Sequence, residues 1–261
     1  MTPDAVFVRN GERYRSTELA LGPWAPGALH GGAPAALLVR AVQDSAPDPA
    51  LALARMTYEF VRPVPFGELS AQVTVVRPGR RVTLLDALLF DRAGVEVTRA
   101  RALLVLPSEL GEPSPSPPPF PGPEQARAND WSRGGGADPM FATDAMEIRF
   151  VEGTFREPGP STAWFRLRRP LVAGEPTSAL ERLAAAADFG NGIASVLSWD
   201  AHVFINPDLT FYVERAPEGE WVALQSQMRV GLGSVAIAES VLWDQQGRVG
   251  LAIQSLLVSR R

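Results

Sequence analysis

The chain is organised around the stretch Leu-Ala-Ala-Ala-Ala-Asp-Phe-Gly-Asn-Gly-Ile-Ala-Ser-Val-Leu, which covers residues 183–197. Its alanines and branched apolar residues predict a helix buried in a core. One carboxylate, Asp188, lies inside it, and a charge on a buried helix needs polar partners. Gly190 and Gly192 add to the problem because each costs about 1 kcal/mol relative to alanine in a helix interior. We therefore expect a sheet or a ligand to lie close to this helix.

Composition limits both the class of protein and its chemistry. The 261 residues, 46% of them hydrophobic, suffice for two cores of about 100 to 130 residues each. The absence of a long apolar run and the Met-Thr-Pro-Asp-Ala start predict a cytoplasmic protein with no membrane partner. With no cysteine and two histidines, His30 and His202, we expect no thiol nucleophile and no metal site. A net charge of -4 with scattered arginines argues against a nucleic-acid partner.

The order of the expected elements is the same in the two halves of the chain. In the first half, a short apolar helix near residues 35–42 precedes four expected strands at 54–62, 68–77, 81–91 and 96–106. In the second half, expected strands at 146–153 and 161–171 precede the helix at 183–197 and another β region. Each half therefore predicts an apolar helix followed by an antiparallel meander.

A fixed period relates the two β regions. Thr57 and Thr210 are 153 residues apart (210 − 57). The same offset aligns Arg62 with Arg215, residues 88–94 with 241–247 and residues 102–105 with 255–258. A single period of this kind predicts an internal duplication.

The duplication predicts an α+β fold made of two tandem units, each with a curved antiparallel sheet wrapped around its apolar helix. Joining the units edge to edge covers two sheet edges. We place the N-terminal unit at residues 1–107, a proline- and glycine-rich linker at 108–142 and the C-terminal unit, which carries the site, at 143–261. The sheet edges that stay open suggest a homo-oligomer.

Several motifs occur in a characteristic order within this frame. They are Trp24 followed by His30-Gly31-Gly32, Ala187-Asp188 on the second helix, Ile205-Asn-Pro-Asp-Leu-Thr210, Arg215-Ala-Pro-Glu-Gly-Glu-Trp221 and Ala252-Ile-Gln-Ser-Leu-Leu-Val258. In their order and spacing the chain resembles a double-hotdog acyl-CoA thioesterase of the thioesterase II type, over nearly its whole length except the linker. The resemblance implies a double-hotdog fold, an acyl-CoA substrate and cofactor-free hydrolysis.

The resemblance also implies where a site lies. In that family a water is held by an Asp on the second helix, a Thr or Ser hydroxyl at the start of a strand and a Gln on the last strand, without a covalent intermediate. Asp188, Asn206 and Gln254 occupy those places, and Asn206 departs from the usual hydroxyl. The chemistry is coherent, because thioester hydrolysis needs a carboxylate to activate water and polar groups to fix it.

Small residues surround these three positions and predict space for substrate. Gln254 shares a strand face with Gly250 and Ala252. The predicted substrate-binding residues are Gly190, Gly192, Gly250, Ala252, His30, Gly31 and Gly32.

The first unit does not repeat the site. At the offset of 153, the positions of Gly250, Ala252 and Gln254 fall on Val97, Arg99 and Arg101, and that of Asn206 falls on Leu53. Aligning Gly32 with Gly190 places His30 opposite Asp188. We therefore expect one working site per chain.

Each site residue also has a structural interpretation, and the activity has alternatives. Asp188 could satisfy helix N–H groups, Asn206 could form a turn, Gln254 could be a sheet amide, and His30 could serve packing. A non-catalytic acyl-CoA or acyl-chain binding protein would have the same fold, and a structural module would need neither the acid nor the small residues. A hotdog dehydratase would place a histidine five residues after the aspartate, where this chain has Ile193.

Overall fold

The computed structural model describes residues 4–108, 116–129, 139–231 and 233–261. The helices are α1 (Gly32–Asp44), α2 (Ala179–Ala187) and α3 (Gly190–Ile193), with a 3₁₀ turn η1 (Glu18–Ala20) and a π turn η2 (Phe141–Ala145). The strands of the first half are β1 (Phe7–Asn10), β2 (Arg13–Ser16), β3 (Ala52–Glu59), β4 (Glu68–Arg77), β5 (Val82–Asp91) and β6 (Glu96–Val105). The remaining strands are β7 (Arg127–Ala128), β8 (Met146–Glu152), β9 (Ser161–Leu167), β10 (His202–Ile205), β11 (Asp208–Val213), β12 (Val222–Val230), β13 (Val235–Trp243) and β14 (Arg248–Arg260).

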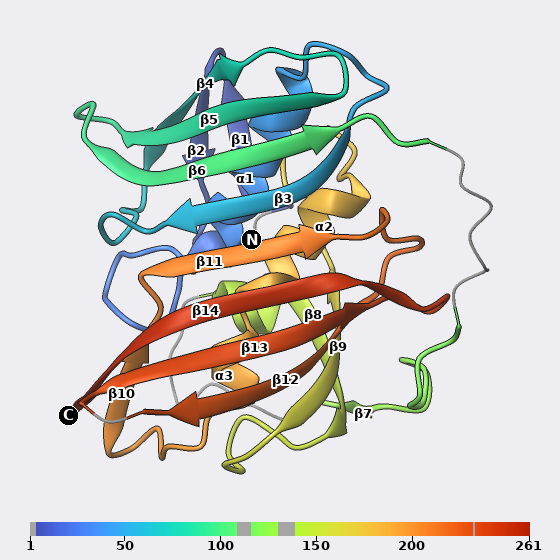
Figure 1. The fold of residues 1–261 in the computed structure, drawn as a ribbon. Coiled ribbons are helices and arrows are strands. Elements are labelled where there is room, and N and C mark those ends of the chain that lie inside the picture. The colour runs from blue at the N-terminus through green and yellow to red at the C-terminus, as the bar shows by residue number, and fades with distance from the viewer. Residues whose placement is uncertain (1–3, 109–115, 130–138, 232) are drawn as a thin grey trace.

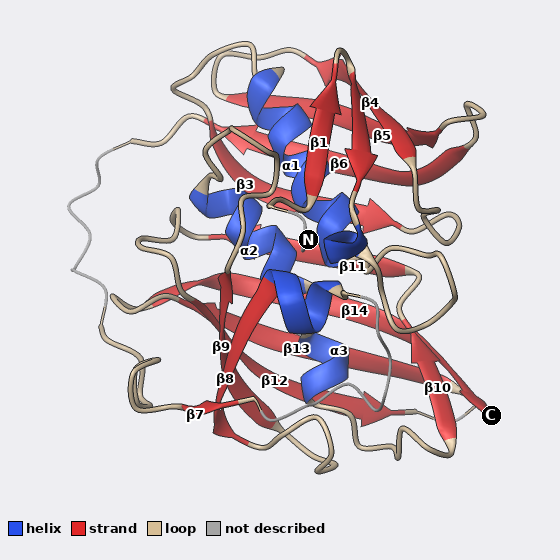
Figure 2. Cartoon of the chain, turned by 180° about the vertical axis from the view of Figure 1, so that it is seen from behind, coloured by secondary structure: helices blue, strands red, loops and turns tan. Residues whose placement is uncertain are grey.

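All these strands form one curved sheet in which the two halves of the chain lie side by side (Figure 1). The order is β1-β2-β4-β5-β6-β3-β11-β14-β13-β12-β9-β8-β7, with β10 paired to β14. Strand β3 of the first half and β11 of the second are the antiparallel neighbours at the junction, where Thr57 pairs with Thr210. The helices lie together against one face of this sheet (Figure 2). The predicted α+β arrangement of two edge-joined units is therefore confirmed.

Helices α1 and α2 pack against each other in opposite directions. Arg40 of α1 donates to Glu181 of α2 at 3.0 Å, and Ser178 Oγ lies 2.8 Å from Gln43 Oε1 near the end of α1. Ser178 and Glu181 also form a capping box, which fixes where α2 begins. The start of α1 consequently lies beside the end of α2.

The second helix is shorter than predicted. It ends at Ala187, and only the single turn α3 follows within the predicted stretch 183–197. A Cβ on Gly190 would lie 2.6 Å from Ser240 Oγ and 3.1 Å from Gln254 Oε1. The backbone is therefore pressed against the sheet at this point, and the expected close approach at Gly190 is to the sheet.

The strand register corrects the positions assigned to the first unit. Thr57 pairs with Arg101, whereas its counterpart Thr210 pairs with Ile253, so Gln254 corresponds to Ala102 and not to Arg101. The cause is a turn that is one residue shorter in the second unit, because Asp91 N–H bonds to the carbonyl of Val95 but Asp244 N–H bonds to that of Gly247.

A slip of one residue exchanges the two faces of a strand. Accordingly Ala102 and Gln254 are both buried, while Arg101 and Ile253 both face outward. The same slip applies to the other matched positions of these strands. Gly250 and Ala252 correspond to Thr98 and Ala100, not to Val97 and Arg99, and residues 255–258 correspond to 103–106, not to 102–105. The conclusion that the first unit lacks the site residues is unaffected.

Part of the predicted linker packs onto the second unit. Phe120 contacts Trp164 and Trp243 edge to face, and Trp164 Nε1 donates to the carbonyl of Pro121 at 2.9 Å. Residues 109–115 and 130–138 of the linker lie outside the described residues, so the boundaries at 107 and 142 stay predictions. Within the described residues, the structure contains no helix that is long and apolar enough to span a membrane.

Candidate active site

Asp188 lies at the C-terminal end of α2, with its carboxylate enclosed by side chains from three segments. Asn206 Nδ2, just before β11, donates to Asp188 Oδ1 at 2.8 Å. Gln254 Nε2, on β14, lies 3.3 Å from the same oxygen. Asp188 is only 6% exposed. The structure thus brings the three predicted catalytic residues together around one carboxylate.

His30 completes the surroundings of this carboxylate from the other unit. Its Nδ1 is 3.2 Å from Asp188 Oδ2, because the antiparallel packing of α1 and α2 sets the start of one beside the end of the other. The imidazole ring is stacked between Phe141 and Phe189, with centroid distances of 5.1 and 4.4 Å. His30 is therefore a direct partner of Asp188, which the sequence pattern did not establish.

Burial shifts the protonation of both groups. It raises the pKa of Asp188 to about 7, against the opposing effect of hydrogen bonds from Asn206 and the backbone of Gly32. Burial also lowers the pKa of His30 to about 3. Near neutral pH the imidazole is uncharged and the carboxyl group lies close to its midpoint, as a general base requires.

The contact between His30 and Asp188 needs one proton. With Asp188 protonated, the carboxyl O–H donates to Nδ1, which also accepts from the backbone N–H of Gly32 at 3.1 Å. With Asp188 ionised, Nδ1–H donates to Oδ2 and the N–H of Gly32 is left to the carboxylate. In both states the imidazole stays neutral. The histidine can therefore stabilise either form of the carboxyl group.

Two glycines at the start of α1 make this contact possible. A Cβ on Gly31 would lie 2.7 Å from Asp188 Oδ2, and one on Gly32 would lie 2.5 Å from the carbonyl oxygen of Ala185. Neither position has room for a side chain. At these two predicted substrate-binding residues, the lack of a side chain therefore lets the Asp188 carboxylate and helix α2 lie close to the start of α1.

Asn191 belongs to the site and was not assigned from the sequence. Its backbone N–H donates to Gln254 Oε1 at 3.0 Å, and its Nδ2 lies 3.4 Å from Asn206 Oδ1. It is almost fully buried. The available signal was a polar residue between Gly190 and Gly192 in an apolar stretch.

A small cavity of about 30 Å³ adjoins Asp188. A space of this size has room for one water molecule when polar groups border it. Its lining residues are Pro23, Trp24, His30, Ala142, Phe155, Asp188, Phe189, Asn191, Gly192, Trp199 and Asn206. We call this space the Asp188 cavity.

Besides Gly31 and Gly32, four predicted site residues are not among those that line the Asp188 cavity. Gln254 is buried behind Asp188, where its side chain contacts both the Asp188 carboxylate and the backbone N–H of Asn191. Gly190 packs on the sheet, and Ala252 is buried within β14. A Cβ on Gly250 would lie 1.9 Å from the carbonyl oxygen of Tyr212, so this glycine allows two strands to approach closely.

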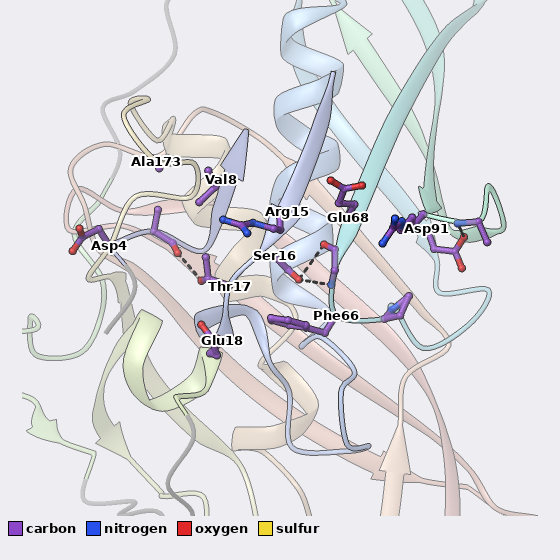
Figure 3. Close-up of a pocket in the computed structure, with 15 residues that line it drawn as sticks. Asp4, Val8, Arg15, Ser16, Thr17, Glu18, Phe66, Glu68, Asp91 and Ala173 are labelled. Atoms are coloured by element: carbon purple, nitrogen blue, oxygen red, sulfur yellow. Dashed lines mark hydrogen bonds between the residues drawn. The ribbon is translucent and has the colours of Figure 1, made fainter. Parts of the chain in front are cut away.

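A larger surface hollow, of about 960 Å³, lies elsewhere on the molecule (Figure 3). It is bordered by charged side chains that include Arg15, Glu68 and Asp91, and Ser16 closes one side through hydrogen bonds with the backbone of Gly67. None of the predicted site residues lines it. Among the described residues, moreover, no group of three or more His, Cys, Asp or Glu side chains is placed to hold a metal ion.

The two sheet-and-helix units and the carboxylate enclosed between them define a double-hotdog protein with a site suited to activating water. The family model for the acyl-CoA thioesterase C-terminal domain matches residues 113–258, and that for the N-terminal domain matches residues 20–105. The chain belongs to the acyl-CoA thioesterase family.

Solved structures have the same fold. A protein from Thermobifida fusca named as a thioesterase II is 21% identical with a TM-score of 0.78, covering 98% of this chain and 96% of its own. A hot dog fold protein of unknown function from Alicyclobacillus acidocaldarius is 16% identical with a TM-score of 0.74, covering 99% and 97%. An acyl-CoA thioesterase II from Mycobacterium marinum is 16% identical with a TM-score of 0.68, covering 98% and 96%. A search of curated proteins found no match.

Proposed function

We propose that the chain hydrolyses acyl-CoA thioesters to a free acid and coenzyme A by direct attack of a water in the Asp188 cavity. The observation that carries this proposal is a buried carboxylate with a pKa of about 7, held by two amides and a neutral imidazole beside a water-sized space. Family membership supplies the substrate class.

The proposed reaction begins with ionised Asp188 taking a proton from the water as its oxygen bonds to the thioester carbonyl carbon. The tetrahedral intermediate then collapses, the carbon–sulfur bond breaks, and the thiolate of coenzyme A leaves. The proton on Asp188 passes to that thiolate or to solvent. No side-chain hydroxyl or thiol lines the described Asp188 cavity, which supports a route without a covalent intermediate on serine, threonine or cysteine.

The amides have different proposed roles. Asn206 lines the cavity, holds Asp188 Oδ1 through Nδ2 and has a carbonyl oxygen that can accept from the water. Gln254 is a positioning residue, because it fixes Asp188 on one side and the backbone of Asn191 on the other. This assignment gives Asn206 the place that a hydroxyl takes in similar proteins.

The test is release of free coenzyme A from acyl-CoAs of increasing chain length, with wild type and Asp188→Ala. We expect turnover by wild type and a large loss in the variant. Binding of acyl-CoA without release at any chain length would identify a non-catalytic acyl-CoA binding protein. Unchanged turnover in Asp188→Ala would exclude this site while leaving the activity in place.

A further inference from the structure

A groove of about 580 Å³ leads away from the Asp188 cavity. Its walls come from residues 154–158, between β8 and β9, and from residues 195–200, beyond α3. Phe155, Gly192 and Trp199 line both spaces. We propose that this groove receives the phosphopantetheine arm of the acyl-CoA, which passes over Gly192 to the Asp188 cavity, and that Arg156 binds the phosphates. This inference rests on the proposed function.

Gly192 is not required by the packing of the fold. A Cβ there would lie 3.7 Å from Phe155 Cε1 and 3.9 Å from Trp199 Cζ2, which is ordinary van der Waals contact. The backbone φ of Gly192 is not positive, so its conformation does not require glycine either. Gly190, two residues earlier, differs because its Cβ would meet Ser240 Oγ at 2.6 Å. The lack of a side chain at Gly192 therefore leaves open the space between the groove and the Asp188 cavity.

The chemistry of the groove fits the arm better than an acyl chain. Its walls alternate apolar rings, such as Phe155 and Trp199, with the hydroxyls of Thr154, Ser195 and Ser198. A pantetheine arm alternates amides with methylene groups, whereas an acyl chain would favour a continuous apolar lining. The indole Nε1–H of Trp199 is buried and has no hydrogen-bond partner among the described residues.

Arg156 is the cation of this groove. It is exposed, and its guanidinium has no ion pair or hydrogen bond among the described residues, so it is available to a ligand. Arg149 and Arg166, on the adjacent strands, are both bound to Glu147. Glu157 and Asp200 also border the groove, so Arg156 is the one cation in a lining that holds two carboxylates. A guanidinium matches the geometry of a phosphate group.

The first experiment compares two substrates that carry the same acyl group, acyl-CoA and acyl-pantetheine, which lacks the phosphates. For Arg156→Glu we expect KM for acyl-CoA to rise about tenfold or more, since a charge-assisted contact is lost and a repulsion is added. The kcat for acyl-CoA and the KM for acyl-pantetheine should stay unchanged. Arg77→Glu is the matched control, because Arg77 is exposed and unpaired among the described residues but lies on the far unit.

The second experiment narrows the passage with Gly192→Ala and Gly192→Val. We expect kcat/KM to fall progressively for both substrates, by a factor that is the same for short and long acyl groups. Thermal unfolding of each variant distinguishes this effect from misfolding, and Gly192→Ala remains informative if Gly192→Val does not fold.

Two results would overturn the inference. One is an unchanged KM for acyl-CoA in Arg156→Glu. The other is a selective loss of long acyl groups in the Gly192 variants, which would show that the groove holds the acyl chain. Calorimetric binding of coenzyme A to wild type and Arg156→Glu needs no turnover, so it tests the groove even if hydrolysis is absent. The absence of release by wild type would instead contradict the proposed function.

Discussion

Thr57 pairs with Thr210 across the junction of the two units, and the two threonines are also equivalent positions of the internal repeat. An approximate two-fold axis must therefore pass between them. The axis relates Asn206 to Leu53, and the strand register relates Gln254 to Ala102. The opposite end of the helix pair thus has the same backbone arrangement without the two amides, in line with the expectation of one working site per chain.

Replacing the carboxylate of Asp188 should abolish base catalysis with little change in shape. For Asp188→Asn we expect kcat for acyl-CoA hydrolysis to fall by about 10²- to 10⁴-fold. Glu12→Gln removes an exposed carboxylate and is the matched control. Retention of more than a tenth of wild-type kcat would contradict the assignment of Asp188 as base.

The rate should depend on pH through Asp188. Because burial raises the pKa of Asp188 to about 7 and the ionised form is the base, kcat/KM should rise with pH and level off above a midpoint near 7. His30, whose pKa is lowered to about 3, should add no step between pH 5 and 9. A flat profile over this range would contradict the assignment of Asp188 as base.

Stability should change with pH in the opposite direction. The pKa of Asp188 is about 7 in the folded chain, against 3.8 for a solvent-exposed aspartate, so ionisation favours the unfolded state as pH rises through this interval. At about 1.4 kcal/mol per pKa unit, the full effect is about 4 kcal/mol. Urea unfolding should show Asp188→Asn gaining stability relative to wild type between pH 5 and 8, and a constant difference would contradict this prediction.

Gln254 should matter for catalysis through the position of Asp188. For Gln254→Ala we expect kcat to fall by about 10²-fold, comparable to the loss of one preorganised donor. The midpoint of the pH profile should also move, because one donor to the carboxylate is lost. Gln225→Ala, an exposed glutamine on the outer face of β12, should leave both quantities unchanged.

Gly31 should not tolerate even a methyl group. Its Cβ would lie 2.7 Å from Asp188 Oδ2, so Gly31→Ala should displace the carboxylate and lower kcat by at least about tenfold, since small misplacements at a reacting centre are costly. Gly122→Ala is the control, because its Cβ would meet nothing within 4 Å. Equal activity of the two variants would contradict the prediction.

The fold followed from the sequence because its signals are periodic and local. Apolar alternation and turn residues placed β4 at 68–77 as predicted, and β5 and β6 to within one residue. The fixed offset then implied two similar units. It failed after residue 244, where a turn is one residue shorter, because a loop can lose a residue at little cost while the following strand changes face.

The site was less visible because its geometry depends on tertiary packing. Asp188, Asn206 and Gln254 could be assigned from order and family resemblance, but the contact of His30 with Asp188 depends on how two helices cross. The helix expected over 183–197 ends at Ala187, and soon after it Gly190 lies against the sheet, a tertiary contact that helix propensity does not encode. Asn191 was missed for the same reason.

The contact of His30 with Asp188 joins residues from two halves that in a protein of separate hotdog subunits would belong to different molecules. Covalent linkage converts such a contact into an intramolecular one with a fixed effective concentration. The local environment of the carboxylate is then independent of how dilute the protein is. Specific activity per chain should accordingly persist at dilutions that would dissociate a two-subunit equivalent.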